Sequence, residues 1–267
     1  MSDPYAKERH TIEQWRFEFD TYGFTVLERV LAESDAETLA DAVSVADDWI
    51  GTDYVHQAAY ARHVMNLLAC DERFVGLVDQ PTVLAAVEAV LGPEVILGSM
   101  NARILRPGDP VQPFHSDIPD QLRKGGSPVM MQAVWMLDPF TEDNGATRIV
   151  PGSHRADSAT PPAGVDVKHW VAPTAPAGSV LLFNGQCWHG GGANQTDAVR
   201  RAVFAHYRVA PWMRFQCDPH DGFPDQLWER LNDRQRQLLR METALGQPNA
   251  ADYARPGDAW SKKGAPE

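Results

Sequence analysis

Cysteine is scarce in this chain, whose 267 residues include only Cys70, Cys187 and Cys217. Three widely separated cysteines are too few for a disulfide framework, and they lack the close pairs of a zinc ribbon. Such sparse cysteine use is typical of a reducing compartment. A chain of this length can bury enough apolar surface to fold without disulfides or a structural metal, so we expect an ordinary globular protein.

Basic residues are also few, because 24 Lys and Arg stand against 36 Asp and Glu, for a net charge of −12. This balance argues against a nucleic-acid partner and against binding to an anionic membrane. The stretch Val171–Thr196 has no Asp, Glu, Lys or Arg, but its two prolines and five glycines exclude a membrane helix. The charged N-terminus lacks the apolar core of a signal peptide. We therefore expect a soluble, cytoplasmic protein.

The two halves of the chain differ in pattern. Hydrophobic spacing predicts helices over 11–22 and 81–91, a strand over 24–28, and a helix over 34–49 with Ser34 as its N-cap. Further on, short β-prone runs are separated by Gly and Pro clusters, over 95–105, 129–137, 147–150, 179–183 and 201–209. Short strands without long helices between them are typical of a β-sandwich or jelly roll.

These patterns predict one domain over residues 1–267, mostly β with flanking helices. Its parts would be a helical N-terminal part over 1–94, a cupin-like jelly-roll core over 95–210, and a C-terminal helical region over 211–267. A helix predicted near 226–245 would close over the site as a lid and exclude water.

The first candidate site residues are His115 and Asp117, with one residue between them. On a strand, residues i and i+2 point to the same face, so an imidazole and a carboxylate can reach one metal ion. Alone, this pair is more typical of a turn with a hydrogen-bonded His-Asp pair. His189, between a predicted strand and a glycine run, can add a second imidazole from another strand. Two His and one carboxylate form the open facial triad of non-haem Fe(II) oxygenases, whereas zinc sites usually take more nitrogen or sulfur.

The third candidate element is Arg200-Arg201, soon after His189. A buried arginine can hold a ligand carboxylate with two parallel hydrogen bonds and a permanent charge. Because side chains alternate along a strand, one of the two arginines can face the interior while the other faces solvent. The alternation leaves open which of them faces inward.

Three segments together resemble a known family. They are His115-Ser-Asp117, then Asn144-Gly-Ala-Thr-Arg-Ile-Val-Pro-Gly-Ser-His154, and then His189-Gly-Gly-Gly-Ala-Asn194 followed by Arg200. They resemble the phytanoyl-CoA dioxygenase family, whose members are Fe(II)- and 2-oxoglutarate-dependent dioxygenases on a double-stranded β-helix. The resemblance extends from about Phe17 to Pro211, and it looks closest to natural-product hydroxylases.

The resemblance implies a role for each matching residue. His115, Asp117 and His189 would be the iron ligands, and Arg200 would bind the distal carboxylate of 2-oxoglutarate. Further residues would hydrogen-bond this cosubstrate, namely Gln112, Thr147 and Asn101. Three more would line the substrate pocket, namely Gln132, Trp135 and Trp212. Dioxygen would be consumed, with release of succinate and carbon dioxide, and the presence of Asp117 argues against halogenation.

The substrate is expected to be a small hydrophobic natural-product intermediate, most simply hydroxylated at an unactivated C–H bond. The segments near the motifs are rich in apolar and aromatic residues, including Met130 and Trp188. Basic residues such as Arg103 and Arg123 are interspersed with acidic ones and are expected to face water rather than a coenzyme A phosphate. The alternatives are a cupin-like metal-dependent isomerase or lyase without dioxygen chemistry, an acyl-CoA or amino-acid hydroxylase of the same family, and a binding module without activity.

Overall fold

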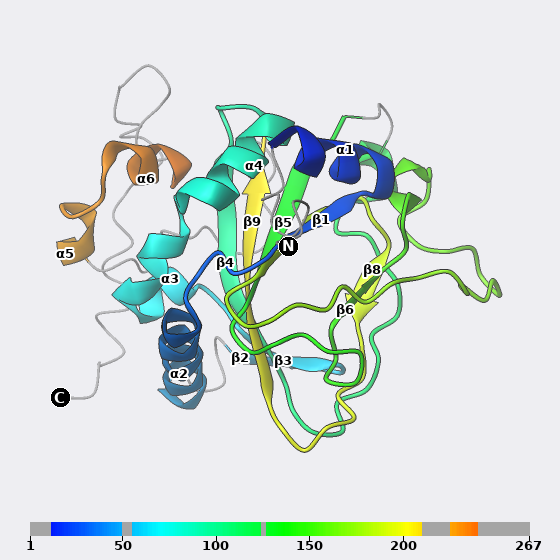
Figure 1. Ribbon diagram of the computed structural model, residues 1–267, viewed down its shortest axis with the longest axis horizontal. Helices are drawn as coiled ribbons and strands as arrows, with labels where there is room; N and C mark the ends of the chain where they lie inside the picture. Colours follow the sequence, from blue (N-terminus) through cyan, green and yellow to red (C-terminus); the bar gives the residue numbers. More distant parts are fainter. Residues whose placement is uncertain (1–11, 50–54, 124–126, 210–224, 240–267) are drawn as a thin grey trace, which may run out of the picture.

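The computed structural model describes residues 12–49, 55–123, 127–209 and 225–239, and a seven-stranded antiparallel sheet runs through it (Figure 1). The strands of this sheet, in spatial order, are β1 (Phe24–Leu27), β7 (Val180–Asn184), β5 (Met130–Met136), β9 (Arg200–Arg208), β4 (Ile96–Leu105), β3 (Ala61–Val64) and β2 (Val55–Ala58). The order is far from the order in sequence, as expected when strands cross between two sheets of a jelly roll.

A second, smaller sheet pairs β6 (Thr147–Ile149) with β8 (His189–Gly191). Single β-bridges extend it, from His115 to His189 on one side and from Ile149 to Val171 on the other. The two sheets pack face to face through a buried apolar cluster that includes Val134, Ile149 and Phe183. The expected jelly-roll core is confirmed.

Strand β5 shows how alternation separates the two faces of the large sheet. Val134 and Met136 point into the cluster between the sheets, whereas Ala133 and Trp135 belong to the core beneath the helices. Gln132 lies on the inner face and borders the site described below. Trp135 is fully buried on the opposite face, so the expectation that it lines a substrate pocket is wrong. Trp135 follows two residues after Ala133 on the strand, so it shares the outer face with Ala133 and not the inner face with Gln132.

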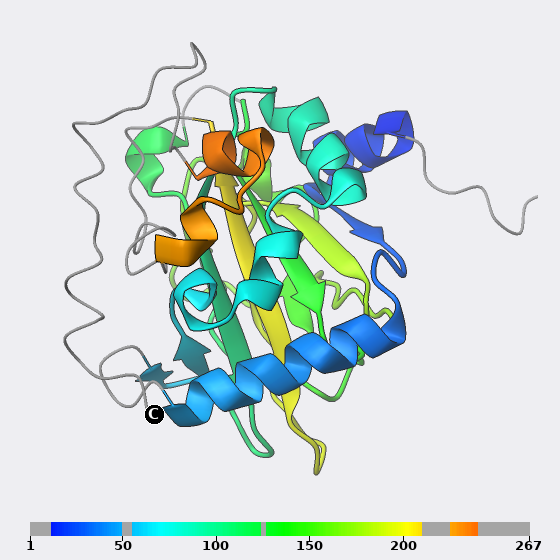
Figure 2. The same cartoon turned by 90° about the vertical axis from the view of Figure 1, so that its left-hand side faces the viewer.

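Helices cover the outer face of the large sheet (Figure 2). They are α1 (Ile12–Tyr22), α2 (Glu33–Trp49), α3 (Leu67–Cys70), α4 (Pro81–Leu91), α5 (Asp225–Trp228) and α6 (Asp233–Leu238). The chain also forms the 3₁₀ turns η2 (Glu72–Leu77), η3 (Asp120–Leu122) and η4 (Ser153–Arg155). None of the helices in the described ranges is long and apolar enough to span a membrane.

Helix boundaries follow local chemistry. Helix α4 has the predicted bounds, with Pro81 at its first position, and it ends at Gly92, whose φ of 88° suits glycine. Helix α2 begins at Glu33, because the N–H groups of Asp35 and Ala36 already donate to the Ala32 carbonyl. Ser34 therefore lies inside the first turn, and its prediction as the N-cap is wrong.

The part of the chain before residue 95 is less helical than predicted. Besides the expected β1, it contributes the hairpin of β2 and β3, which adds to the edge of the large sheet beside β4. The hairpin is tied to α2, since Asp47 forms ion pairs with Arg62 of β3 and with Arg106. Its short, polar strands carry little periodicity, so the sequence did not reveal them.

The C-terminal helices α5 and α6 pack on the helical side of the large sheet. Leu227, Leu231 and Leu238 join the core there, and Asn232 and Gln235 hydrogen-bond to Asp79. These helices therefore do not cover the inner face of the sheet, and for them the expected lid is wrong. Residues 211–224 and 240–267 of that expected lid lie outside the described residues.

Candidate active site

The site begins with a backbone contact between two distant histidines. The N–H of His115 donates to the carbonyl of His189 at 3.0 Å, and the N–H of His189 donates back at 2.8 Å. Residues that exchange both bonds in an antiparallel pair point their side chains to the same face, and the two rings lie 4.5 Å apart. Gly190 permits this approach, because a Cβ there would lie 2.7 Å from the carbonyl oxygen of Gln112.

His115, Asp117 and His189 bring their ligand atoms within 4.8 Å of one another. The Nδ1 atoms of the two rings lie 3.1 Å and 3.0 Å from the carbonyl oxygens of Pro113 and Cys187. A carbonyl only accepts, so each Nδ1 carries the proton and leaves the Nε2 lone pair free for a metal, as ligating histidines usually do. Nε2 of His189 lies 3.7 Å from Oδ2 of Asp117.

The electrostatics suit a cation at this point. Burial lowers the pKa of His189, so its imidazole is neutral near pH 7. Burial raises the pKa of the Asp117 carboxyl, but the nearby His189, His115 and His206 and the Gln132 amide outweigh burial and hold the pKa below its usual value. Two imidazoles and one ionised carboxylate form a donor set that fits Fe(II).

Gln132 links the carboxylate ligand to a buried histidine. Its Nε2 lies 3.1 Å from Oδ2 of Asp117 and 3.1 Å from Nδ1 of His206. Burial lowers the pKa of His206 to about 4, so its Nδ1 is an acceptor for this amide. The amide therefore fixes the orientation of the Asp117 carboxylate from behind.

Arg200 and Arg201 have opposite surroundings. Arg200 is buried at the inner face of β9, where Nη2 donates to the carbonyl of Gly145 at 2.5 Å and the guanidinium lies 4.5 Å from the Phe140 ring centroid. Its Nε and Nη1 have no hydrogen-bond partner among the described residues. Arg201 faces outward and forms two bonds to Asp138, at 2.8 and 2.9 Å. The unpaired, buried donors of Arg200 fit a bound carboxylate.

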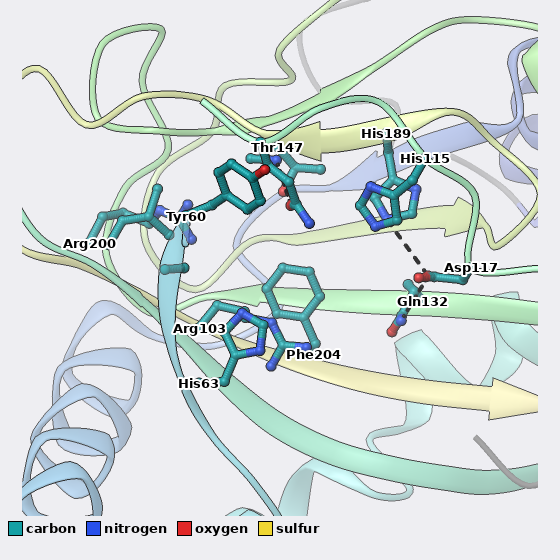
Figure 3. Close-up of a pocket in the computed structure, with 14 residues that line it drawn as sticks. Tyr60, His63, Arg103, His115, Asp117, Gln132, Thr147, His189, Arg200 and Phe204 are labelled. Atoms are coloured by element: carbon teal, nitrogen blue, oxygen red, sulfur yellow. Dashed lines mark hydrogen bonds and ion pairs between the residues drawn. The ribbon is translucent and has the colours of Figure 1, made fainter. Parts of the chain in front are cut away.

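A cavity of about 230 Å³ joins Arg200 to the His-Asp-His cluster (Figure 3). Among the residues expected to bind the cosubstrate or substrate, Gln112, Thr147 and Gln132 line it. Asn101 does not line it, because its Oδ1 accepts the backbone N–H of Asn66 at 2.8 Å. Trp212 lies outside the described residues.

The aromatic character expected around the cluster is weaker than the sequence suggested. Met130 packs with Ile118 in a separate small cluster, and Trp188 donates to the carbonyl of Ser158 at 2.7 Å. Neither lines the cavity, whose carbon-rich walls include Leu105 and Phe204.

Arginines expected to face water lie inside instead. Arg123 is 5% exposed and donates to the carbonyls of Ser153, Ala156 and Gln186, so it ties loops together. Arg103 of β4 lines the cavity. One signal in the sequence could have located it, since Arg103 follows two residues after Asn101, which was itself predicted to face the site.

Residues 19–202 match the family described as Phytanoyl-CoA dioxygenase (PhyH). The chain belongs to this family. One relative is Dioxygenase af480 of Aspergillus fumigatus, which is 30% identical over 164 residues. The matched region covers 60% of this chain and 52% of the relative. Dioxygenase cdmA of Talaromyces verruculosus is 39% identical over 149 residues, covering 54% and 49% of the two chains. The chain thus spans about half the length of these two curated relatives.

A full-length match also exists. Uncharacterized protein Rv1501 of Mycobacterium tuberculosis is 27% identical over 267 residues, covering 96% of each chain. Among solved structures, the non-heme alpha ketoglutarate dependent epimerase SnoN from nogalamycin biosynthesis has a TM-score of 0.62 at 18% identity, covering 78% of this chain and 85% of that one. This likeness supports the jelly-roll fold.

Family membership and the His-Asp-His cluster together define the class of enzyme. The chain belongs to a family of 2-oxoglutarate-dependent non-haem iron dioxygenases, and its His-Asp-His cluster offers the ligand set of that class. Fe(II), 2-oxoglutarate and dioxygen are the cofactor and cosubstrates that this class implies. The alternatives without dioxygen chemistry, an isomerase or lyase and an inactive binding module, are not supported.

Proposed function

We propose that this dioxygenase hydroxylates an unactivated C–H bond of a small, largely hydrophobic natural-product intermediate, with conversion of 2-oxoglutarate to succinate and carbon dioxide. The observation that carries the proposal is the cavity shared by the metal-ligand cluster and Arg200, whose Nε and Nη1 lack partners among the described residues. A dicarboxylate bound there would have one end at the metal and the other at the guanidinium.

His115, Asp117 and His189 would hold Fe(II), which supplies the activation of dioxygen when bound. Three protein ligands leave positions open for the keto acid group of 2-oxoglutarate and for dioxygen. Arg200 would hold the distal carboxylate of 2-oxoglutarate by two hydrogen bonds. The Phe140 ring and the Gly145 carbonyl keep the guanidinium in place before the cosubstrate arrives.

Gln112 and Thr147 would orient the cosubstrate between these two ends. Oε1 of Gln112 accepts the backbone N–H of Gly191 at 3.2 Å, which fixes the amide and directs its NH₂ group away from β8. Thr147 is buried on β6, directly opposite Gly191, where no side chain competes for the space. Both side chains border the cavity and can donate hydrogen bonds to a bound carboxylate.

The preference for a hydrophobic natural product has two supports. The walls contributed by Leu105, Ala61 and Phe204 suit a carbon skeleton. The structural neighbour SnoN is named for the biosynthesis of nogalamycin, and the dioxygenase af480 shares 30% identity with this chain. An acyl-CoA substrate would need a cationic site for its phosphates, and only Arg103 and Arg200 among the arginines of the described residues line the cavity.

The test starts with the purified protein under anaerobic conditions. Addition of Fe(II) and 2-oxoglutarate should produce the weak visible charge-transfer band of a chelated keto acid. After admission of air, a panel of terpenoid and polyketide compounds is screened for succinate release matched by a product heavier by one oxygen atom. A folded, iron-loaded protein without the band would contradict the dioxygenase site, and matched succinate release with an epimerised or desaturated product would contradict hydroxylation alone.

A further inference from the structure

Arg103 places a second cation in the cavity. Its side chain comes from β4, on the large sheet, and faces Thr147 on the small sheet across the cavity (Figure 3). The guanidinium lies over the Phe204 ring, 5.4 Å from its centroid, and Nη1 donates to the Ala102 carbonyl at 3.2 Å. Within the described part of the chain, no carboxylate lies within ion-pair distance of it. The remaining N–H groups of Arg103 therefore have no anionic partner.

This position is costly for an arginine without a ligand. Burial lowers the pKa of Arg103 to about 10, and only the charge of Asp117 counteracts this effect. A guanidinium that loses water without a paired anion destabilises the fold. The Phe204 ring offsets part of that cost, as cation–π contacts do. A ligand anion would supply the rest.

The cosubstrate does not account for Arg103. The proposed function assigns one carboxylate of 2-oxoglutarate to Arg200, on β9, and the keto acid group to the metal. Arg103 enters from β4 beside His63, its partner in the β3–β4 register. Tyr60 and His63 of the adjoining hairpin also line this side of the cavity. This side therefore offers polar groups that the cosubstrate leaves unused.

We propose that Arg103 binds a carboxylate of the substrate, so that the dioxygenase acts on a hydrophobic carboxylic acid, with its carboxylate at Arg103 and its carbon skeleton against Phe204 and Leu105. The proposal rests on the proposed function, because it assumes that Arg200 holds 2-oxoglutarate. The planar guanidinium matches a carboxylate by two parallel hydrogen bonds, which orients the skeleton as well as binding it. A fixed carboxylate would present one carbon of the skeleton to the metal, so Arg103 would determine the position of oxidation.

The test compares acids with their methyl esters, which have the same skeleton without the charge. Geranic, cinnamic and abietic acids and their esters are titrated into the anaerobic complex with Fe(II) and 2-oxoglutarate, and the shift of the charge-transfer band gives the affinity. Thermal stabilisation by the same compounds is measured in metal-free protein. At least one acid should bind roughly tenfold or more tightly than its ester, the usual scale for a charged hydrogen bond.

Variants then assign the effect to Arg103. Arg103→Gln should weaken binding of the acid roughly 10- to 150-fold while changing the affinity for its ester and for 2-oxoglutarate by less than about threefold. Arg103→Lys should recover part of the affinity, since it keeps the charge without the planar pair of donors. Arg29→Gln, at a side chain 71% exposed, is the control for loss of one positive charge.

Three outcomes would overturn the proposal: equal binding of acids and esters by the wild-type protein, no binding of any acid, or a loss of 2-oxoglutarate affinity in Arg103→Gln as large as in Arg200→Gln. The last outcome would assign Arg103 to the cosubstrate. Absence of the charge-transfer band in the wild-type protein would instead contradict the proposed function. The acid and ester comparison in metal-free protein would still test the anion site in that case.

Discussion

The adjacent arginines Arg200 and Arg201 have different roles because they point to opposite faces of strand β9. Arg200 stacks on Phe140 inside the cavity, and Arg201 pairs with Asp138 on the outer face of the sheet. Both are cations on the same strand, so only the face to which each points separates their roles. Arg201 is therefore a matched control for substitutions of Arg200.

Replacement of Arg200 by Gln should raise the KM for 2-oxoglutarate roughly 10- to 150-fold, because a charged hydrogen bond contributes about 1.5–3 kcal/mol. Arg201→Gln should leave this KM within about threefold and lower the free energy of unfolding by about 1 kcal/mol or less, as loss of a partly exposed ion pair does. Initial rates at varied 2-oxoglutarate and urea unfolding measure the two effects. The reverse pattern would show that Arg201 holds the cosubstrate.

Removal of a metal ligand should abolish turnover without unfolding the protein. His115→Ala, Asp117→Ala and His189→Ala should each lower iron occupancy and product formation at least about 100-fold, since three ligands are few for an open site. His154→Ala is the control, because that ring lies at another cavity, 3.3 Å from the Asp20 carbonyl. Iron content and single-turnover product are measured, and full activity in folded His189→Ala protein would exclude the triad.

At the residue scale, the sequence located polar site residues better than apolar ones. His115, Asp117 and His189 stand in a recognisable spacing, and the structure brings them together. Trp135 was misplaced because an aromatic residue suits a core and a pocket equally, and only its strand face decides. Arg103 was missed because a charged residue usually faces solvent, and this expectation outweighed its position on the same strand face as Asn101.

Among the elements, β6 supports the site through a side chain on its outer face. The Arg148 guanidinium lies over the rings of Phe114 and Trp170, 4.6 and 5.3 Å from their centroids. Its Nη2 donates to the Gln112 carbonyl at 2.6 Å. Arg148 therefore holds the segment that carries both Gln112 and His115, and it acts by positioning rather than by contact with the cosubstrate.

Arg148→Met should loosen this segment. The expected result is a rise of roughly three- to tenfold in the 2-oxoglutarate KM and a weaker iron affinity, from loss of one hydrogen bond and two cation–π contacts of about 0.5–1 kcal/mol each. Arg148→Lys keeps the charge, so its 2-oxoglutarate KM and its iron affinity should lie between those of Arg148→Met and the wild type. Kinetic and iron-binding constants identical to wild type in Arg148→Met would contradict the positioning role.

Prediction at the element scale depended on the strength of the local pattern. Helix α4 has a proline at its start and a glycine after its end, and its bounds were correct. The four-residue strands β2 and β3 have no such signals, and they exist because β4 offers them an edge. The register of β4, β5 and β9 likewise arises from tertiary pairing, which no local pattern encodes.

For the whole molecule, buried histidines make stability depend on pH. Burial lowers the pKa of His206 to about 4 from an ordinary 6.5, and burial also lowers the pKa values of His189 and His154. Between about pH 4 and pH 6.5, His206 binds more protons in the unfolded chain than in the folded one. Acidification through this range therefore destabilises the fold. From about pH 7 to about pH 5, His206 alone should lower the free energy of unfolding on the order of 2 kcal/mol.

This pH dependence is measured by urea unfolding of the metal-free protein. His206→Gln should show a smaller loss of stability over the same range, because the substituted side chain does not titrate. His169→Gln, at an exposed histidine, should retain the wild-type dependence. A His206→Gln protein with the full wild-type loss would contradict the assignment to His206.

The whole arrangement also determines what happens when the metal is removed. Main-chain hydrogen bonds between His115 and His189 hold two of the three ligands together. Organisation of the ligands is thus completed during folding, unlike in zinc fingers, which unfold without their metal. Dialysis against a chelator should therefore leave the circular dichroism spectrum and the melting temperature nearly unchanged. Readdition of Fe(II) should then restore activity at the rate of metal entry, with no refolding phase.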